Sequence, residues 1–300
     1  MSIRIVYDTH GGPEVLRVEE VTVGDPGPGQ VRVRNQAVGV NPVDWKIVSG
    51  AFGRGGEPEG PTVPGLAAAG VVEAVGPAVS GIAVGDDVIA TGPAGGYQAV
   101  TLADPALLRV RPATIDPDQG AALPVSATTG YALAETAEVH RGDTVLIHGA
   151  SGAVGAAAAQ VAIDRGATVI GTASPANHDY LRSLGVIPLA YGEGLEVQVR
   201  AAGQPTVILD AVGGEATVRA SRAFLTDGVR TATVSPDQYA RSAGITPVKH
   251  PSDELDAVIR LAAAGKLSTR IGKVLPLADA AEAFRISTSG HPNGKILLRP

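Results

Sequence analysis

The stretch TVLIHGASGAVG at residues 144–155 decides the fold of this 300-residue chain. Its first part, Thr144–His148, is a short apolar run that predicts a buried strand. Three glycines follow at a spacing of three, and the alanine-rich segment from Ala153 to Arg165 predicts a helix. A strand, a glycine-spaced turn and a helix in this order are typical of a dinucleotide-binding unit.

Each glycine in this turn has an expected task. Gly149 allows a tight turn off the strand, Gly152 lets the backbone approach a pyrophosphate, and Gly155 lets the helix pack closely on the sheet. The start of the helix offers backbone N–H groups and a positive dipole end to the phosphates. The other residues expected to contact the cofactor in this turn are Ser151, Ala153 and Val154. A simple abundance of Gly and Ala is the alternative, and the coincidence of strand, glycines and helix disfavours it.

The strand predicted at residues 168–172 bears on the choice between NAD and NADP. A chain that binds NAD usually places Asp or Glu about 20 residues past the glycines, where the acid holds the ribose 2′-hydroxyl. Here Ser174 stands near that position, and a hydroxyl donates to a 2′-phosphate that a carboxylate would repel. His178 and Arg182 follow on the next predicted helix and could add positive charge near this phosphate. Arg182, however, is more simply explained as a solvated surface residue. The sequence therefore predicts a preference for NADP(H).

Composition limits the other classes of function. With 44% hydrophobic and 18% charged residues the chain is globular, and its net charge of −6 disfavours nucleic acid as a partner. The absence of cysteine excludes disulfides, thiolate metal sites and a cysteine nucleophile. Since no apolar stretch reaches about 18 residues and the N-terminus has no signal-peptide pattern, we expect no membrane segment and a cytoplasmic location.

Pattern changes along the chain predict two domains of an α/β protein. Residues 1–115 are rich in alternating strands and in Gly- and Pro-containing turns, which fits an antiparallel, barrel-like domain. Strands alternate with helices in residues 116–274, which predicts a doubly wound parallel sheet. We expect the final segment, residues 275–300, to rejoin the first domain.

Several motifs together resemble one family. They are GGPEVL (11–16), GVNPVDWK (39–46), GVVEAVG (70–76), VGDDV (84–88), GGY (95–97), ALP (122–124), the glycine turn, DAVGG (210–214) and GKI (294–296). Their order and spread resemble the zinc-independent, zeta-crystallin-like quinone oxidoreductases of the medium-chain dehydrogenase/reductase superfamily. The resemblance implies a GroES-like catalytic domain, a Rossmann domain for NADP(H), an active-site cleft between them, and a homodimer.

The resemblance also bears on metals. Zinc-dependent members of the superfamily carry a cysteine ligand near the position of Asn41 and a histidine in a Gly-His-Glu stretch. The matching stretch here is PGLAAAG at residues 64–70, which has no histidine, cysteine or acid. Ala67 also stands where many quinone-reductase relatives have an acidic residue. Without ligands of the right type and number, we expect no metal site.

Candidate site residues follow from the same resemblance. It implies that Asn41 contacts the nicotinamide ribose or the substrate oxygen, that Lys46 stabilises charge or donates a proton, and that Asp44 orients Lys46. The alternative is an Asn-Pro turn signal followed by a surface ion pair of little energetic value. Further cofactor contacts are implied at Thr129, Tyr191, Ala211, Val212 and Val234. Aromatic residues expected to line the substrate pocket, or alternatively the core, are Trp45, Phe52 and Tyr131.

These features favour a reductase that transfers hydride from NADPH to a small molecule, either a quinone or an α,β-unsaturated carbonyl. Such acceptors delocalise the developing charge by conjugation, so they do not need zinc to stabilise it. Two alternatives remain from the sequence alone. One is an enoyl reductase or tailoring enzyme devoted to a single metabolite, and the other is an NADPH-binding protein with little turnover.

Overall fold

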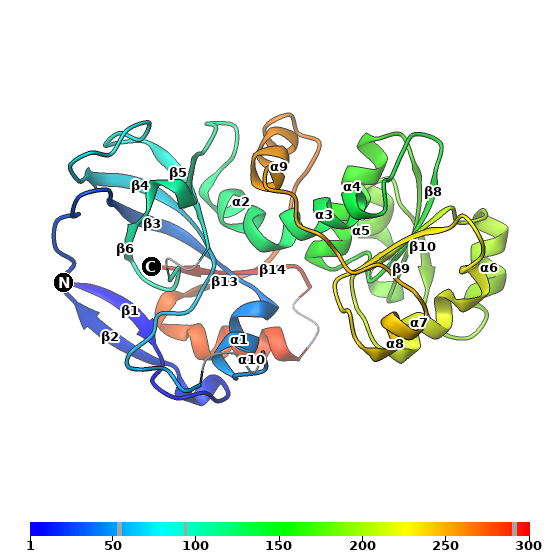
Figure 1. The fold of residues 1–300 in the computed structure, drawn as a ribbon, viewed down its shortest axis with the longest axis horizontal. Coiled ribbons are helices and arrows are strands. Elements are labelled where there is room, and N and C mark those ends of the chain that lie inside the picture. Colours follow the sequence, from blue (N-terminus) through cyan, green and yellow to red (C-terminus); the bar gives the residue numbers. More distant parts are fainter. Residues whose placement is uncertain (53–55, 93–94, 290–292) are drawn as a thin grey trace. The chain divides into compact units, whose positions relative to one another are not determined.

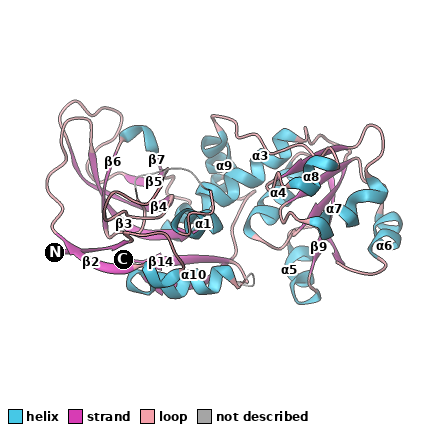
Figure 2. Ribbon diagram, turned by 60° about the horizontal axis from the view of Figure 1, so that its bottom comes forward, coloured by secondary structure: helices cyan, strands magenta, loops and turns pink. Residues whose placement is uncertain are grey.

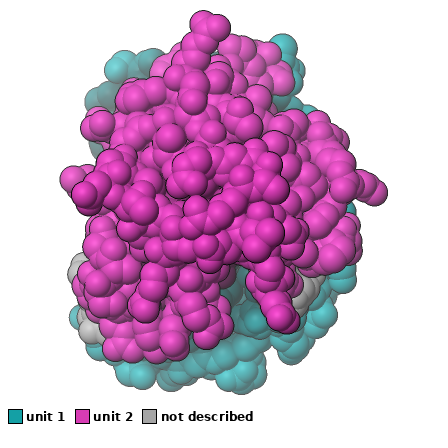
Figure 3. All heavy atoms as spheres, turned by 90° about the vertical axis from the view of Figure 1, so that its right-hand side faces the viewer, with its two compact units in different colours: residues 1–125, 270–300 teal, residues 126–269 magenta. Residues whose placement is uncertain are grey.

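The chain folds into two compact units. The computed structural model describes residues 1–52, 56–92, 95–289 and 293–300. The units consist of residues 1–125 with 270–300, and of residues 126–269 (Figure 3). The first unit extends past the boundary expected at residue 115, because α2 (Pro117–Ala122) packs on β3 (Val31–Val40) and β4 (Ala67–Val75).

The first unit is built mainly of strands (Figure 1). Its other elements are β1 (Ser2–Val6), β2 (Arg17–Val21), α1 (Pro42–Val48), β5 (Asp87–Thr91), β6 (Val100–Ala103), β7 (Leu108–Val110), β13 (Ile271–Pro276), α10 (Ala280–Thr288) and β14 (Lys295–Arg299). Within the described residues the larger sheet has the order β13-β14-β3-β4-β5-β7, and β6 also pairs with β3. The final strand, β14, runs antiparallel to β3, with Ile296 opposite Val40.

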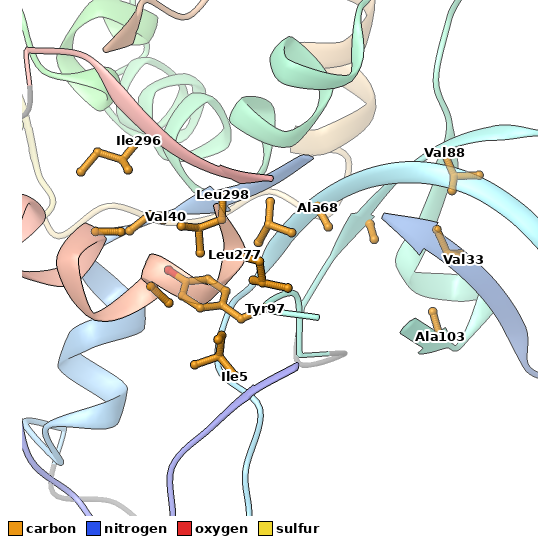
Figure 4. Close-up of a cluster of buried hydrophobic side chains, with 14 of the residues drawn as sticks. Ile5, Val33, Val40, Ala68, Val88, Tyr97, Ala103, Leu277, Ile296 and Leu298 are labelled. Atoms are coloured by element: carbon orange, nitrogen blue, oxygen red, sulfur yellow. The ribbon is translucent and has the colours of Figure 1, made fainter. Parts of the chain in front are cut away.

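Aliphatic side chains from both ends of the chain share the core of this unit. Ile5 of β1, Val40 of β3 and Leu298 of β14 belong to one buried cluster (Figure 4). Tyr97 is fully buried in the same cluster, and its ring meets Phe284 edge-to-face with 5.9 Å between centroids. Burial of each such side chain contributes about 1.5–3 kcal/mol, so the core holds the C-terminal segment on the sheet.

The second unit alternates strands with helices (Figure 2). Its elements are α3 (Thr128–Thr136), β8 (Thr144–His148), α4 (Ala153–Asp164), β9 (Thr168–Ala173), α5 (His178–Ser183), β10 (Ile187–Ala190), α6 (Leu195–Ala202), β11 (Val207–Asp210), α7 (Glu215–Ser221), β12 (Arg230–Thr233), α8 (Gln238–Ser242) and α9 (Glu254–Ala263). All pairs of the sheet are parallel, in the order β10-β9-β8-β11-β12. The prediction of a two-domain α/β fold with a doubly wound sheet is confirmed. Over the part of the chain described, none of the helices has the length and apolar character needed to cross a bilayer.

Candidate functional site

One edge of the parallel sheet gathers the predicted cofactor contacts. His148, the last residue of β8, is level with Thr172 of β9 and with Asp210 of β11, and the outer strands end at the same height. The residues that follow these strand ends are Gly149, Ser174, Tyr191, Ala211, Val212 and Val234. The strand order reverses at β8, since β9 and β10 follow on one side of it and β11 and β12 on the other. Ligands of doubly wound sheets bind beyond the carboxyl ends of the strands at such a reversal.

The three glycines of the turn differ in what surrounds them. Gly149 has a φ of +71°, and a Cβ there would lie 2.4 Å from the side chain of Val212. A Cβ on Gly155 would lie 2.3 Å from the carbonyl oxygen of Gly149. Gly152 has an ordinary φ of −72°, and a Cβ there would meet only that same oxygen, at 3.4 Å. The fold therefore explains Gly149 and Gly155, whereas the glycine at 152 leaves space for something outside the chain.

The start of α4 provides donors beside that space. Gly152 is the N-cap residue of this helix, and no side chain caps it. Residues 151–154 are exposed or half-buried, in contrast to residues 155–162, which are buried. The first N–H groups of a helix have no partner inside the helix, and they carry the positive end of its dipole. Ser151, Ala153 and Val154 thus stand where the backbone can bind an anion.

Ser174 lies just beyond the end of β9. It is half-buried, and its Oγ accepts a hydrogen bond of 3.2 Å from Asn177. His178 lies on the first turn of α5, with its Nε2 3.4 Å from the carbonyl oxygen of Ala173. Arg182 pairs with Asp179 at 2.6 Å on the exposed side of α5, which fits the solvated role expected for it. The structure thus brings the polar side chains of Ser174 and His178 to this strand end, together with that of Asn177.

A buried histidine lies directly beneath the glycine turn. His148 Nε2 is 2.9 Å from Ser221 Oγ, and its Nδ1 is 3.4 Å from Thr172 Oγ1, which in turn accepts from the N–H of Gly149. Ser221 donates to the carbonyl of Thr217, so it accepts from Nε2–H of a neutral ring. Burial lowers the pKa of His148 from 6.5 to about 4, and the charge of Asp210 opposes this shift. The sequence could have indicated this residue, since His148 is the last residue of the strand that leads into the glycine turn.

We expect this histidine to make stability fall in acid. Its pKa is lower in the folded state, so its contribution is fully present above about pH 6.5 and is lost as the pH falls through about 4. The difference corresponds to about 3 kcal/mol of unfolding free energy. Urea unfolding at several pH values should show a shallower acid slope for His148→Gln than for the wild type. The exposed His140→Gln is the control and should keep the wild-type slope; equal slopes in all three proteins would contradict the assignment.

A second polar cluster lies inside the first unit. Asn41, at the start of α1, is fully buried, and its Oδ1 accepts a hydrogen bond from Nζ of Lys295 on β14. The Asp44 carboxylate accepts from the Asn41 backbone N–H at 2.8 Å and from the Tyr97 hydroxyl at 3.0 Å. Both Asp44 and Lys295 are at most 3% exposed. The structure thus joins two predicted residues, Asn41 and Asp44, to two that the sequence analysis missed.

Burial changes the acid–base properties of this cluster. It raises the pKa of Asp44 from 3.8 to about 6, against the opposing effects of the Asn41 hydrogen bonds, the positive charge of Lys295 and the Tyr97 hydroxyl. It lowers the pKa of Lys295 from 10.5 to about 8, with Asp44 acting in the opposite direction. Burial also raises the pKa of Tyr97, and the Asp44 carboxylate adds to this effect. Perturbed groups of this kind gather at functional sites more often than elsewhere.

Lys46 lies outside the cluster. Its side chain is exposed and its Nζ stands 5.6 Å from the centre of the Trp45 ring. The expectation that Asp44 orients Lys46 is wrong, because residues two apart on α1 project to different sides of the helix. Asp44 points into the unit and Lys46 points out of it.

The aromatic candidates have different surroundings. Trp45 packs against the core of the first unit, and Phe52 is 53% exposed. Tyr131 faces the guanidinium of Arg165, at the opposite end of α4 from the glycine turn, where it lines a cavity of about 310 Å³ with residues of α9. Within its unit, Tyr131 is therefore turned away from the strand ends. Thr129, half-buried on α3, is next to Gly130, which packs on the first turn of α4 at Val154.

Comparison with known proteins agrees with both units. Residues 27–107 match the alcohol dehydrogenase GroES-like domain, and residues 192–298 match the zinc-binding dehydrogenase family. A quinone oxidoreductase of Sus scrofa is 33% identical over 313 residues, covering 96% of this chain and 94% of the relative. The chain belongs to the quinone oxidoreductase family of the medium-chain dehydrogenase/reductase superfamily. It is therefore an oxidoreductase of a family that uses a nicotinamide cofactor.

Solved structures add two likenesses over the whole chain. The quinone oxidoreductase of Coxiella burnetii is 26% identical, with a TM-score of 0.84, and covers 100% of this chain and 99% of its own. The CurK enoyl reductase is 25% identical, with a TM-score of 0.84 and 99% coverage of both chains. The family resemblance inferred from the sequence motifs is confirmed.

Proposed function

We propose that this quinone oxidoreductase relative reduces a quinone or an α,β-unsaturated carbonyl with NADPH and without zinc. The observation that carries the proposal is the open space beside Gly152, at the start of α4. Gly152 has an ordinary backbone conformation and almost nothing near a Cβ, so neither backbone strain nor packing requires glycine there, although glycine is a favourable N-cap residue. A ligand that approaches the backbone at the start of α4 does require glycine, and a dinucleotide pyrophosphate fits that position.

The residues at the strand ends would divide the binding of NADP(H). Backbone N–H groups of Ser151, Ala153 and Val154 bind the pyrophosphate, whereas that of Gly152 donates to the Gly149 carbonyl. The hydroxyl of Ser174 donates to the 2′-phosphate, with His178 beside it. Ala211, Val212 and Val234 line the edge through which the nicotinamide half would extend. When bound, the cofactor supplies the hydride. The chain's own task is to hold and orient it and to exclude water.

Reduction without zinc fits the residues present. The chain has no cysteine, and the described residues contain no cluster of three or more His, Asp or Glu side chains able to hold a metal ion. A conjugated acceptor spreads the negative charge that follows hydride addition, so hydrogen-bond donors suffice to stabilise it. In the first unit, the candidate to provide such stabilisation is Lys46, at the surface of α1. The predicted residue Asn41 is fully buried, and its amide already binds Lys295 and Gly39. Cytoplasmic location and a homodimer remain predictions.

A second candidate function is the reduction of enoyl thioesters, which the likeness to the CurK enoyl reductase favours. Steady-state oxidation of NADPH with quinones, enones and enoyl thioesters separates the two. We expect kcat/KM to be highest for a quinone or a simple enone. A clear preference for enoyl thioesters would favour the second candidate, and tight NADPH binding with no oxidation across the panel would favour a binding protein with little turnover.

A further inference from the structure

A lysine is buried on the C-terminal strand of the first unit. Lys295 begins β14, is 3% exposed, and is followed by three buried aliphatic residues, 296–298. Because Ile296 lies opposite Val40, the antiparallel register brings Lys295 opposite Asn41, which is 254 residues away in sequence. Removing an ammonium group from water is costly, so a lysine at this position needs a compensating partner.

The contacts of Lys295 fix the orientation of the Asn41 amide. An ammonium group only donates, so Lys295 can bind the oxygen Oδ1 and never the nitrogen. On the other side, Asn41 Nδ2 donates to the carbonyl oxygen of Gly39 at 3.2 Å, and that oxygen can only accept. The two neighbours demand opposite ends of the amide. Its orientation is therefore set by their chemistry and has a single solution.

Asp44 completes the arrangement from the third side. Its Oδ2 binds the backbone N–H of Asn41 and the hydroxyl of Tyr97, and lies 3.4 Å from Asn41 Nδ2. Its Oδ1 is buried and has no hydrogen-bond partner among the described residues. The charged or titratable groups that act on this carboxylate are Lys295 and Tyr97. Lys295 thus balances the buried charge of Asp44 while it holds the side chain of Asn41.

We propose that Lys295 is a positioning residue, which acts together with Asp44 to hold Asn41, the N-cap residue of α1, and thereby keeps the start of this helix in the place that serves hydride transfer. The inference rests on the proposed function, because it assumes that the exposed side of α1 stands beside the reacting groups. It assigns the buried cation of this cluster to the end of the chain, in place of the exposed Lys46. Glycine-turn residues of the other unit carry the pyrophosphate, so the loss of Lys295 should affect the chemical step more than cofactor affinity.

The test compares three variants with the wild type. In Lys295→Met we expect kcat to fall roughly a hundredfold, the loss typical of a misplaced site group, while the Kd for NADPH stays within about twofold. Asp44→Asn/Lys295→Met removes both charges, so it should fold even where the single variant leaves an unbalanced carboxylate, and kcat should stay low. Lys273→Met changes an exposed lysine on the neighbouring strand and should behave as the wild type. Full kcat in a folded Lys295→Met or in the double variant would overturn the proposal.

A second readout does not depend on turnover. The Asp44 carboxyl carbon, followed by NMR against pH, should titrate at a higher pH in Lys295→Met than in the wild type, because the positive charge of Lys295 holds its pKa down. An unchanged titration would refute the coupling of the two residues, and with it the proposal. A wild-type protein that oxidises no NADPH would instead refute the proposed function, and the titration would still decide whether Lys295 holds this cluster.

Discussion

Replacing Gly152 with alanine is expected to weaken NADPH binding roughly a hundredfold while the protein stays folded, a loss of about 2.7 kcal/mol. The new methyl group meets only the Gly149 carbonyl, at 3.4 Å, so the chain itself accepts it. It would, however, occupy the space through which a pyrophosphate reaches the N–H groups of α4. Because alanine is a poorer N-cap than glycine, we allow a stability cost of up to about 1 kcal/mol.

Gly155→Ala is the matched comparison, because it adds the same methyl group three residues along. Its Cβ would lie 2.3 Å from the carbonyl oxygen of Gly149, so the turn and helix must move apart. Overpacking of this kind costs about 1–3 kcal/mol, and Tm should fall by several degrees. Calorimetric titration with NADPH and thermal unfolding, applied to both variants, separate a binding role from a packing role. Wild-type affinity in Gly152→Ala would remove the main support for the cofactor site.

Ser174→Asp is expected to shift the cofactor preference from NADPH towards NADH. A carboxylate at this strand end repels the 2′-phosphate of NADPH and accepts from the ribose 2′-hydroxyl of NADH. We expect kcat/KM with NADPH to fall roughly a hundredfold and kcat/KM with NADH to rise, because a lost charge-assisted hydrogen bond and a new repulsion act together. The measurement is steady-state kinetics with both cofactors and one acceptor.

Ser183→Asp is the control for that shift in cofactor preference. It adds the same charge to the exposed end of α5, where Ser183 Oγ bonds only its own helix at the carbonyl of Tyr180. Its cofactor preference should match the wild type. If Ser174→Asp leaves both values of kcat/KM unchanged, or if the control changes them equally, then Ser174 does not contact the 2′-phosphate.

Local patterns predicted the second unit well. The strand, the glycine turn and the alanine-rich helix follow each other within about 20 residues, so their arrangement depends on short-range geometry. The fold class and the family could be predicted for this reason. The extent of the first unit could not be predicted, because α2 has an ordinary helical pattern and the pattern does not say on which sheet it packs.

The cluster around Asn41 shows where sequence reasoning ends. Asp44 and Lys46 are near neighbours in sequence, and only the helical course of α1 separates them. Lys295 is brought to Asn41 by the pairing of β14 with β3, a contact between opposite ends of the chain. The available signals were a lysine at the start of a strongly apolar strand and the place of that lysine in the GKI motif. Tyr97, which completes the cluster, lies in a loop, and the GGY motif that contains it does not indicate which residues its side chain contacts.

The cofactor preference of the wild-type protein is measured by kcat/KM with NADPH and with NADH, using the same quinone or enone. We predict that both cofactors reduce the acceptor and that kcat/KM is at least about tenfold higher with NADPH, a difference that corresponds to about 1.4 kcal/mol at the 2′-phosphate. Equal values for the two cofactors, or a preference for NADH, would contradict this prediction.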